Sequence, residues 1–374
     1  MRFCVEARDG KARAGKLVTD RGTVLTPVFM PVGTRATVKA VPVADLKNQV
    51  GATIILANTY HLHLRPGVET LRKAGGIHAF MSWDGHVLTD SGGYQVYSLA
   101  GQRKITEAGV IFASHIDGSR HFFTPENVVD EQRFIGSDVQ MTLDECPPFP
   151  CEYDYARRSL ELTHRWAERA RKRFLETSPP YDYEQYQFGI VQGSTYKDLR
   201  EKSVSKLLEI GFDGYAIGGL AVGEPTQTMY EITEFCCDRL PDDRPRYLMG
   251  VGTPANILES IARGVDMMDC VLPTRNARHG LYYTFEGVRN AKNAKYADDF
   301  SPLDPDGDTI VDQTYSKAYV RHLFSVQEWL AAHILTVHNL AFFRRLVQNA
   351  RAHILSGTFE AWKNRVSSAL NERL

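Results

Sequence analysis

Short apolar runs separated by helical patterns recur along most of the chain. Eight such runs occur, at residues 26–33, 52–60, 86–95, 138–146, 187–194, 214–224, 246–252 and 265–275. Apolar runs that alternate with amphipathic helices are typical of parallel strands in βα units. Eight units are enough to close a sheet on itself, so the pattern predicts an α/β fold, a (β/α)8 TIM-type barrel over residues 1–296.

Helix signals lie between these runs. Thr124-Pro125 and Thr253-Pro254 each place a capping hydroxyl before a proline at the first helical position. A further helix has one apolar face and one basic face. Its apolar face is formed by Leu160, Thr163, Ala167, Ala170 and Phe174, and its basic face by Arg165, Arg169, Lys172 and Arg173. We interpret the basic face as a solvated surface.

The pattern changes after residue 296. Five aspartates fall between Asp298 and Asp308, and the remainder has an almost wholly helical pattern. We therefore expect an appended, mostly helical subdomain over residues 297–374.

Composition narrows the class of protein. The chain has 44 Lys and Arg against 45 Asp and Glu, so any site for a polyanion must be a local patch. Its six cysteines show no framework spacing, which favours a reduced, cytoplasmic protein. No signal peptide and no run of apolar residues long enough to span a membrane is present, and no membrane partner is expected.

Several predicted strands end in polar residues, at the edge where barrel enzymes place their reactive groups. The strand ends are Asn58, Asp90, Asp144, Gln192, Gly219, Met249 and Asp269, of which all but Gly219 and Met249 are polar. Asp90 and Asp269 form a candidate pair for glycosyl chemistry, in which one carboxylate attacks an anomeric carbon and the other transfers protons. The alternative is that each aspartate merely caps the following helix.

The same edge has features suited to a flat base. Tyr94 offers a stacking face, Met249 a soft opposite wall, and Asp144 and Gln192 the hydrogen-bonding groups that suit a purine. The Gly-Gly after Asp90 would let a substrate approach the backbone closely.

A basic segment follows the strand that ends at Asp269. It contains Arg275, Arg278, Arg289, Lys292 and Lys295, with Glu286 as its only acid. Phosphates bound there would lie beside the candidate nucleophile. A plain solvated loop is the alternative.

His61 and His63 form an H-x-H pattern of the kind that metal-dependent hydrolases use. Such sites need further ligands at later strand ends, and no later strand end carries histidine. Packed or hydrogen-bonded histidines are the favoured interpretation.

Several motifs together resemble one known family. They are DSGGYQ (90–95), LDEC (143–146), VQGS (191–194), GGLAVGE (218–224), LMGVGTP (248–254) and DCVLPTRNARHG (269–280). In this order the chain is similar to bacterial tRNA-guanine transglycosylase, also called queuine tRNA-ribosyltransferase. The resemblance implies an irregular (β/α)8 barrel with an appended zinc-binding subdomain.

The resemblance implies that guanine at the wobble position of tRNAs with GUN anticodons is exchanged for 7-aminomethyl-7-deazaguanine, a step toward queuosine. Asp269 would be the nucleophile that forms a covalent ribosyl-enzyme, and Asp90 the general acid and base.

Further roles are implied by the same likeness. The base would be bound by Asp144, Gln192 and the Gly219 amide between Tyr94 and Met249, and the Leu220 carbonyl, aided by Glu224, would accept the aminomethyl group. Cys146 and Val222 would exclude the bulkier base queuine. The tRNA would contact Arg275 and Arg278, with Lys292 and Lys295 in the same basic segment.

The chain departs from the family at its zinc site. The family uses C-x-C-x-x-C and a later histidine, but here the cysteine positions read Gly307, Thr309 and Asp312, and only His338 is retained. We therefore predict no zinc and no other cofactor, with the subdomain held by apolar packing and His338 a packed helix residue. Asp304, Asp306, Asp308 and Asp312 have calcium-loop spacing, but Thr309 and Tyr315 replace its essential glycine and glutamate.

Tyr315, Tyr319 and His322 match family positions at a two-fold contact, so a homodimer is expected. Two alternatives to a wobble-guanine enzyme remain open: a non-catalytic RNA-binding partner subunit, and a family relative acting on DNA or on another tRNA position. Retention of both Asp90 and Asp269 argues against the first. The absence of a further RNA-binding module after residue 374 argues against the archaeal type of the second.

Overall fold

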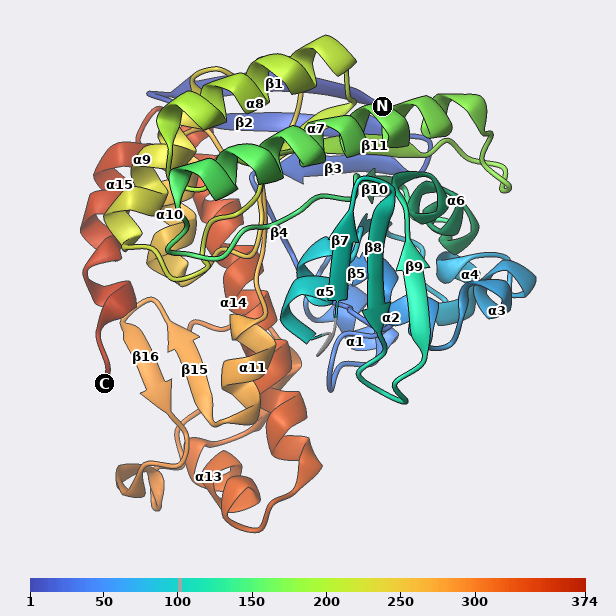
Figure 1. Cartoon of the computed structure of the whole chain (residues 1–374). Helices are drawn as coiled ribbons and strands as arrows, with labels where there is room; N and C mark the ends of the chain where they lie inside the picture. The colour runs from blue at the N-terminus through green and yellow to red at the C-terminus, as the bar shows by residue number, and fades with distance from the viewer. Residues whose placement is uncertain (100–102) are drawn as a thin grey trace.

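A parallel sheet forms the centre of the protein (Figure 1). The computed structural model describes residues 1–99 and 103–374. In this part of the chain the sheet has eight strands, in the order β4 (Val28–Met30), β14 (Met267–Asp269), β13 (Arg246–Leu248), β12 (Gly214–Ile217), β11 (Tyr186–Val191), β10 (Val139–Met141), β6 (His86–Asp90) and β5 (Ile54–Asn58). Seven of these strands lie within the predicted runs, and β11 begins one residue before its run.

The two ends of this sheet meet just beyond β4. Val32 forms a parallel bridge with Leu56 of β5, and the Gly33 amide donates to the Leu56 carbonyl at 2.6 Å. The sheet is therefore nearly closed into a barrel, which confirms the predicted fold class. Apolar side chains such as Met30, Leu88, Met141 and Phe188 fill its interior.

Helices follow the strands and surround the barrel. They are α1 (Val43–Asn48), α2 (Thr59–Leu64), α3 (Val68–Lys73), α4 (Ile77–Met81), α5 (Gly93–Leu99), α6 (Pro125–Ile135), α7 (Tyr153–Glu176), α8 (Lys197–Ile210), α9 (Thr226–Cys237), α10 (Pro254–Ala262) and α11 (Leu272–Arg278). Thr124 and Thr253 each form a capping box at the start of α6 and α10, as predicted.

Helix α7 buries the predicted apolar face, including Leu160, Ala167 and Phe174. Its basic face is not simply solvated. Arg165, Arg169 and Arg173 form ion pairs with Glu107, Glu126 and Asp130. The basic face is therefore bound to neighbouring elements.

An N-terminal antiparallel sheet closes the amino-terminal end of the barrel. Its strands are β1 (Arg2–Asp9), β2 (Ala12–Thr19) and β3 (Gly22–Thr26), and Phe3, Leu17 and Val24 join the barrel-interior core. Arg13 forms a buried ion pair with Asp266, directly before β14. The carboxyl ends of the strands lie at the opposite end of the barrel.

A second small sheet lies beside the loop that follows β10. It contains β7 (Arg103–Thr106), β8 (Gly109–Ala113) and β9 (Arg120–Phe123). Val110, Phe112 and Phe123 pack in one cluster with Leu143 and Trp166. The sequence pattern did not reveal this sheet or the N-terminal one.

The C-terminal part is mostly helical, as predicted, and begins with a hairpin. Its elements are β15 (Leu281–Thr284), β16 (Gly287–Asn290), η1 (Ala294–Tyr296), α12 (Ile310–Thr314), α13 (Lys317–Ser325), α14 (Trp329–Leu355), α15 (Phe359–Ser367) and η2 (Ala369–Asn371). Helix α14 packs on α11, β15 and the N-terminal strands. The domain division after residue 296 stays a prediction. No helix among the described residues has both the length and the apolar character that crossing a membrane requires.

Candidate active site

Asp90 is the last residue of β6 and its side chain is buried. Its Oδ2 accepts a hydrogen bond of 3.0 Å from the Asn58 side chain, at the end of the neighbouring strand β5. Burial, together with the charges of Asp144 and Asp269, raises the pKa of Asp90 to about 7. The carboxyl group is therefore able both to give and to take a proton near neutral pH.

Asp144 and Gln192 are joined to each other. Gln192 Nε2 donates to Asp144 Oδ2 at 2.7 Å, and both side chains are buried. Burial raises the pKa of Asp144 to about 6, against the effect of the Gln192 hydrogen bond. Gln192 Oε1 is buried and has no hydrogen-bond partner among the described residues. A buried acceptor without a donor is costly, so this atom is suited to bind an N–H group of a ligand.

Asp269, the last residue of β14, is held by two donors on one oxygen. The Tyr247 hydroxyl donates to Oδ1 at 2.6 Å and the Gly250 amide at 2.8 Å. Burial raises the pKa of Asp269 above its usual value, while these two hydrogen bonds act in the opposite direction. With Oδ1 fixed by both donors, the rotation of the carboxylate is restricted and Oδ2 is directed away from them.

The glycines after Asp90 serve the packing of the chain itself. A Cβ on Gly92 would lie 2.7 Å from the Tyr60 Cβ, and a Cβ on Gly93 would lie 2.6 Å from the Asp144 carbonyl oxygen. The interpretation of Gly-Gly as space for a substrate is therefore corrected: neighbouring chain already occupies that space. The glycines bring the end of β6 against Asp144.

Arg200, on α8, is a functional candidate that the sequence analysis missed. It is fully buried, and its guanidinium donates to the carbonyls of Ser194 at 2.7 Å, Val191 at 2.8 Å and Gly218 at 2.8 Å. These carbonyls flank Gln192 and Gly219. The planar, multiply donating guanidinium thus fixes two strand ends relative to each other.

Comparison with known proteins identifies the family. The model of the queuine tRNA-ribosyltransferase family matches residues 8–372. The chain belongs to the queuine tRNA-ribosyltransferase family. The queuine tRNA-ribosyltransferase of Caldanaerobacter subterraneus subsp. tengcongensis is 56% identical over 344 residues, covering 92% of this chain and 90% of the relative. That of Caulobacter vibrioides is 54% identical over 362 residues, covering 96% of each chain.

The remaining candidates for binding a base surround the same strand ends. Tyr94 is 45% exposed, and Met249 is half-buried and lies beside Gly218. Cys146 is buried, and burial raises the pKa of its thiol to about 12, so the side chain is neutral and apolar in character. A Cβ on Gly219 would lie 2.3 Å from Gln192 Oε1, so only glycine fits at this position.

Glu224 organises the loop after Gly219. Its carboxylate accepts hydrogen bonds from the amides of Ala221 at 2.5 Å and Val222 at 3.0 Å. Leu220 is buried and Val222 half-buried. Glu224 therefore fixes the backbone that presents the Leu220 carbonyl.

The basic residues predicted to contact tRNA divide between two segments. Arg275 and Arg278 lie on α11, and the Lys292 side chain passes within 3.1 Å of the position of a Gly280 Cβ, just beyond the end of this helix. Lys295 lies on η1, with its ammonium 5.2 Å from the ring centre of Tyr296. Arg289 is paired with Glu286.

Of the H-x-H histidines of α2, His61 packs against the rings of Tyr60 and His115, and His63 is hydrogen-bonded, as favoured above. His63 contacts Glu131 at 3.0 Å and His121 at 2.8 Å. Burial lowers the pKa of His61 to about 4, so this side chain is neutral. The described residues contain no group of three or more metal-ligating side chains placed to hold an ion.

The positions that resemble the family zinc site do not fit zinc. Asp312 and His338 are fully buried and bonded to each other, and Thr309 donates to Asp312. His338 is a packed residue of helix α14, as expected, and in addition both of its ring nitrogens form polar contacts.

Proposed function

We propose that this protein replaces the wobble guanine of tRNAs with GUN anticodons by 7-aminomethyl-7-deazaguanine, a step toward queuosine. Family membership makes the chain a pentosyltransferase that acts on tRNA guanine. One observation supports the finer proposal most strongly. Two buried carboxyl groups, Asp90 and Asp269, lie at the same end of the barrel, beside the hydrogen-bonding pair Asp144 and Gln192, and the charge of Asp269 acts on Asp90.

Asp269 is the proposed nucleophile. Its Oδ2 attacks C1′ of the target ribose while the bond from C1′ to N9 of guanine breaks. The Tyr247 hydroxyl and the Gly250 amide stabilise the other oxygen and keep the carboxylate oriented. The covalent ester holds the RNA while the bases exchange, so the phosphodiester chain stays intact.

Asp90 is the proposed general acid and base. In its protonated form it donates a proton to the departing guanine, and the resulting carboxylate then accepts the proton of the incoming base. That base attacks C1′ and releases Asp269. A pKa of about 7 gives substantial amounts of both forms at neutral pH, which this double role requires.

The proposed contacts to the base use the hydrogen-bonding atoms of the site. Asp144 accepts from the N–H groups of the purine edge, and the unpartnered Gln192 Oε1 accepts from a further donor. The Gly219 amide donates to the ring carbonyl, and the Leu220 carbonyl accepts from the aminomethyl group. Tyr94 and Met249 stack on the two faces of the ring, and Cys146 and Val222 limit the space for a larger substituent.

The target nucleotide must leave its stack to reach these groups. An anticodon loop permits this at low energetic cost. Arg275 and Arg278 of α11 then bind the RNA backbone or the following uridine, with Lys292 and Lys295 extending the contact. A homodimer in the cytoplasm, joined through the region of Tyr315 and Tyr319, completes the proposal.

The test is incorporation of labelled guanine into a tyrosine tRNA transcript, with a control transcript whose wobble guanine is adenine. The proposal expects label in the first transcript only. Asp269→Asn should remove incorporation but retain tRNA binding, whereas Asp154→Asn, the same change on an exposed carboxylate of α7, should leave both intact.

Three outcomes would contradict the proposal. Tight tRNA binding by the native protein without incorporation would favour the non-catalytic partner subunit. Label in the control transcript, or in DNA, would favour a relative with another target. Loss of tRNA binding in Asp269→Asn would make the role of Asp269 structural.

A further inference from the structure

A set of five side chains joins the C-terminal helix α14 to the segment that precedes it and to the barrel. We propose that Thr309, Asp312, His338, Arg344 and Arg345, here called the α14 clamp, hold the C-terminal subdomain in place without a metal ion. The proposal goes beyond the base-exchange activity and does not depend on it.

The inner part of the clamp is a buried ion pair. His338 Nδ1 donates to Asp312 Oδ1 at 2.5 Å, and His338 Nε2 donates to the Tyr283 carbonyl of β15 at 2.8 Å. The Thr309 hydroxyl and amide donate to Asp312 Oδ2 at 2.6 Å and 3.2 Å. Every polar atom of the two charged side chains is thus hydrogen-bonded, the condition under which a buried pair is tolerated.

The clamp leaves neither space nor free donors for a metal. Both ring nitrogens of His338 and both carboxylate oxygens of Asp312 are already engaged. A Cβ on Gly307 would lie 2.3 Å from the Asp312 carboxylate, so this carboxylate fills the volume that a side chain at 307 would need. Tetrahedral zinc requires four free ligands, usually including cysteines, and the sequence has no cysteine between residues 297 and 374.

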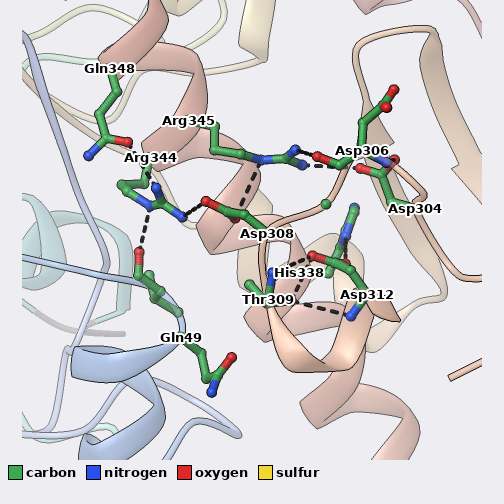
Figure 2. A network of polar contacts seen from close by, with 12 residues as sticks. Gln49, Asp304, Asp306, Asp308, Thr309, Asp312, His338, Arg344, Arg345 and Gln348 are labelled. Atoms are coloured by element: carbon green, nitrogen blue, oxygen red, sulfur yellow. Dashed lines mark hydrogen bonds and ion pairs between the residues drawn. The ribbon is translucent and has the colours of Figure 1, made fainter. Parts of the chain in front are cut away.

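Two arginines of α14 extend the clamp over the aspartate-rich segment, as Figure 2 shows. Arg345 donates to Asp304 at 3.1 Å and to the Asp306 carbonyl, and Arg344 pairs with Asp308. Arg344 also donates to the Val50 carbonyl of the barrel at 2.9 Å. Asp304 and Asp308 of the acidic segment are therefore each paired with an arginine of α14.

The clamp is continuous with the helix proposed to bind tRNA. Asn339, next to His338, donates to the Pro273 carbonyl of α11 at 3.0 Å and to the Leu281 carbonyl of β15 at 3.0 Å. Helix α11 carries Arg275 and Arg278. Loosening the clamp should therefore raise the KM for tRNA more than it lowers kcat.

The first experiment examines the native, full-length protein. We expect elemental analysis to find no stoichiometric metal, and the Tm measured with and without EDTA or phenanthroline to be the same. Stoichiometric zinc, or a fall of the Tm by several degrees on chelation, would overturn the proposal.

The second experiment is a double-mutant cycle on Asp312→Asn and His338→Gln, followed by thermal unfolding. Each single variant leaves one charged group buried without its partner, so each should lower the Tm by several degrees, and the double variant by less than the sum. Additive shifts, or shifts no larger than that of the control, would overturn the proposal. The control is Asp306→Asn, whose backbone carbonyl rather than its carboxylate accepts from Arg345.

A milder variant keeps the test decisive if the charged variants do not fold. Thr309→Val removes only the hydroxyl that donates to Asp312. We expect faster hydrogen exchange in residues 303–316 and unchanged exchange in the barrel strands. Unchanged exchange in residues 303–316 would contradict the clamp.

Discussion

The protein contains two groups of buried or partly buried aspartates, which differ in whether a cationic side chain lies beside them. At the end of the barrel, Asp90, Asp144 and Asp269 lie close together, and burial raises the pKa of each. In the C-terminal part, Asp312 is paired with His338, and hydrogen bonds from His338 and Thr309 outweigh burial and lower its pKa. Both groups have the same side chain, but only the second has cations beside it.

The difference shows how a carboxylate can be used. A buried acid with a cationic partner stabilises the fold while it stays charged. A buried acid without a cationic partner has its pKa raised toward neutral pH, and its charged form lowers the stability of the fold. Such raised pKa values are typical of acid-base catalysts. The barrel aspartates are therefore expected to serve chemistry, and the C-terminal aspartates to serve structure.

Loss of activity without loss of binding is the largest expected effect. Asp269→Asn removes the nucleophile and should lower base exchange on the order of 10⁴-fold. Single-turnover assays and tRNA-binding measurements on the same preparation check this. A variant retaining a tenth of the native rate would end the assignment of Asp269 as nucleophile.

Opposite effects on stability would sharpen the comparison. Asp312→Asn leaves His338 without its buried partner and should destabilise the protein by about 3–5 kcal/mol. Asp90→Asn removes an acid that the fold disfavours when charged, so it should stabilise the protein at pH 8. Denaturant unfolding of both variants measures the free energies, and the comparison fails if the two changes have the same sign.

The stabilisation by Asp90→Asn should depend on pH. The pKa of Asp90 is about 7 in the folded protein and lower in the unfolded chain. The unfolded state therefore binds fewer protons between about pH 4 and 7, and the native protein loses stability as the pH rises through this range. The gain from Asp90→Asn should be several-fold larger at pH 8 than at pH 5, and an equal gain at both would argue against the raised pKa.

Base affinity should decrease when the fully buried guanidinium is changed. Arg200→Lys keeps the charge but cannot donate to Ser194, Val191 and Gly218 together. We expect the KM for guanine to rise about 10-fold, as for loss of one good hydrogen bond in the site, with little change in the KM for tRNA. An equal rise of the KM for guanine and the KM for tRNA would instead indicate general unfolding of the loops that Arg200 joins.

The smallest expected effect concerns the orientation of the nucleophile. Tyr247→Phe removes one of the two donors on Asp269 Oδ1. The pKa of Asp269 should rise further, so the acidic limb of the pH-rate profile should move to higher pH, with a loss of kcat of about 10-fold or less. A pH profile identical to that of the native enzyme would exclude this role for Tyr247.

Much of the barrel could be predicted from the sequence. The barrel strands are buried on both faces, so their sequences are continuous apolar runs. Such runs can be recognised without knowing how the strands pair or which turns connect them. The strand-end residues Asn58, Asp90 and Asp269 were also predicted, since position at the carboxyl end of a strand follows from the run itself. The added sheets were missed, although Gly10, with its positive φ at the first position of the two-residue loop between β1 and β2, is a hairpin signal.

The candidate site was only partly predictable. Asp144 and Gln192 were expected to serve one ligand, but their mutual hydrogen bond depends on two loops that approach in space. Arg200 and Tyr247 act on residues from other strands, and nothing in their local sequence distinguishes them from ordinary core residues.

The sequence by itself determined the barrel strands, the strand-end carboxylates, the family and the loss of the cysteines at positions 307, 309 and 312. These features depend on local pattern and residue identity. The tertiary structure decided which carboxylates have a cation beside them, because pairing of Asp312 with His338, or crowding of Asp90 by Asp144 and Asp269, joins segments distant in the chain. Burial and neighbouring charge set a pKa, and both exist only in the folded protein.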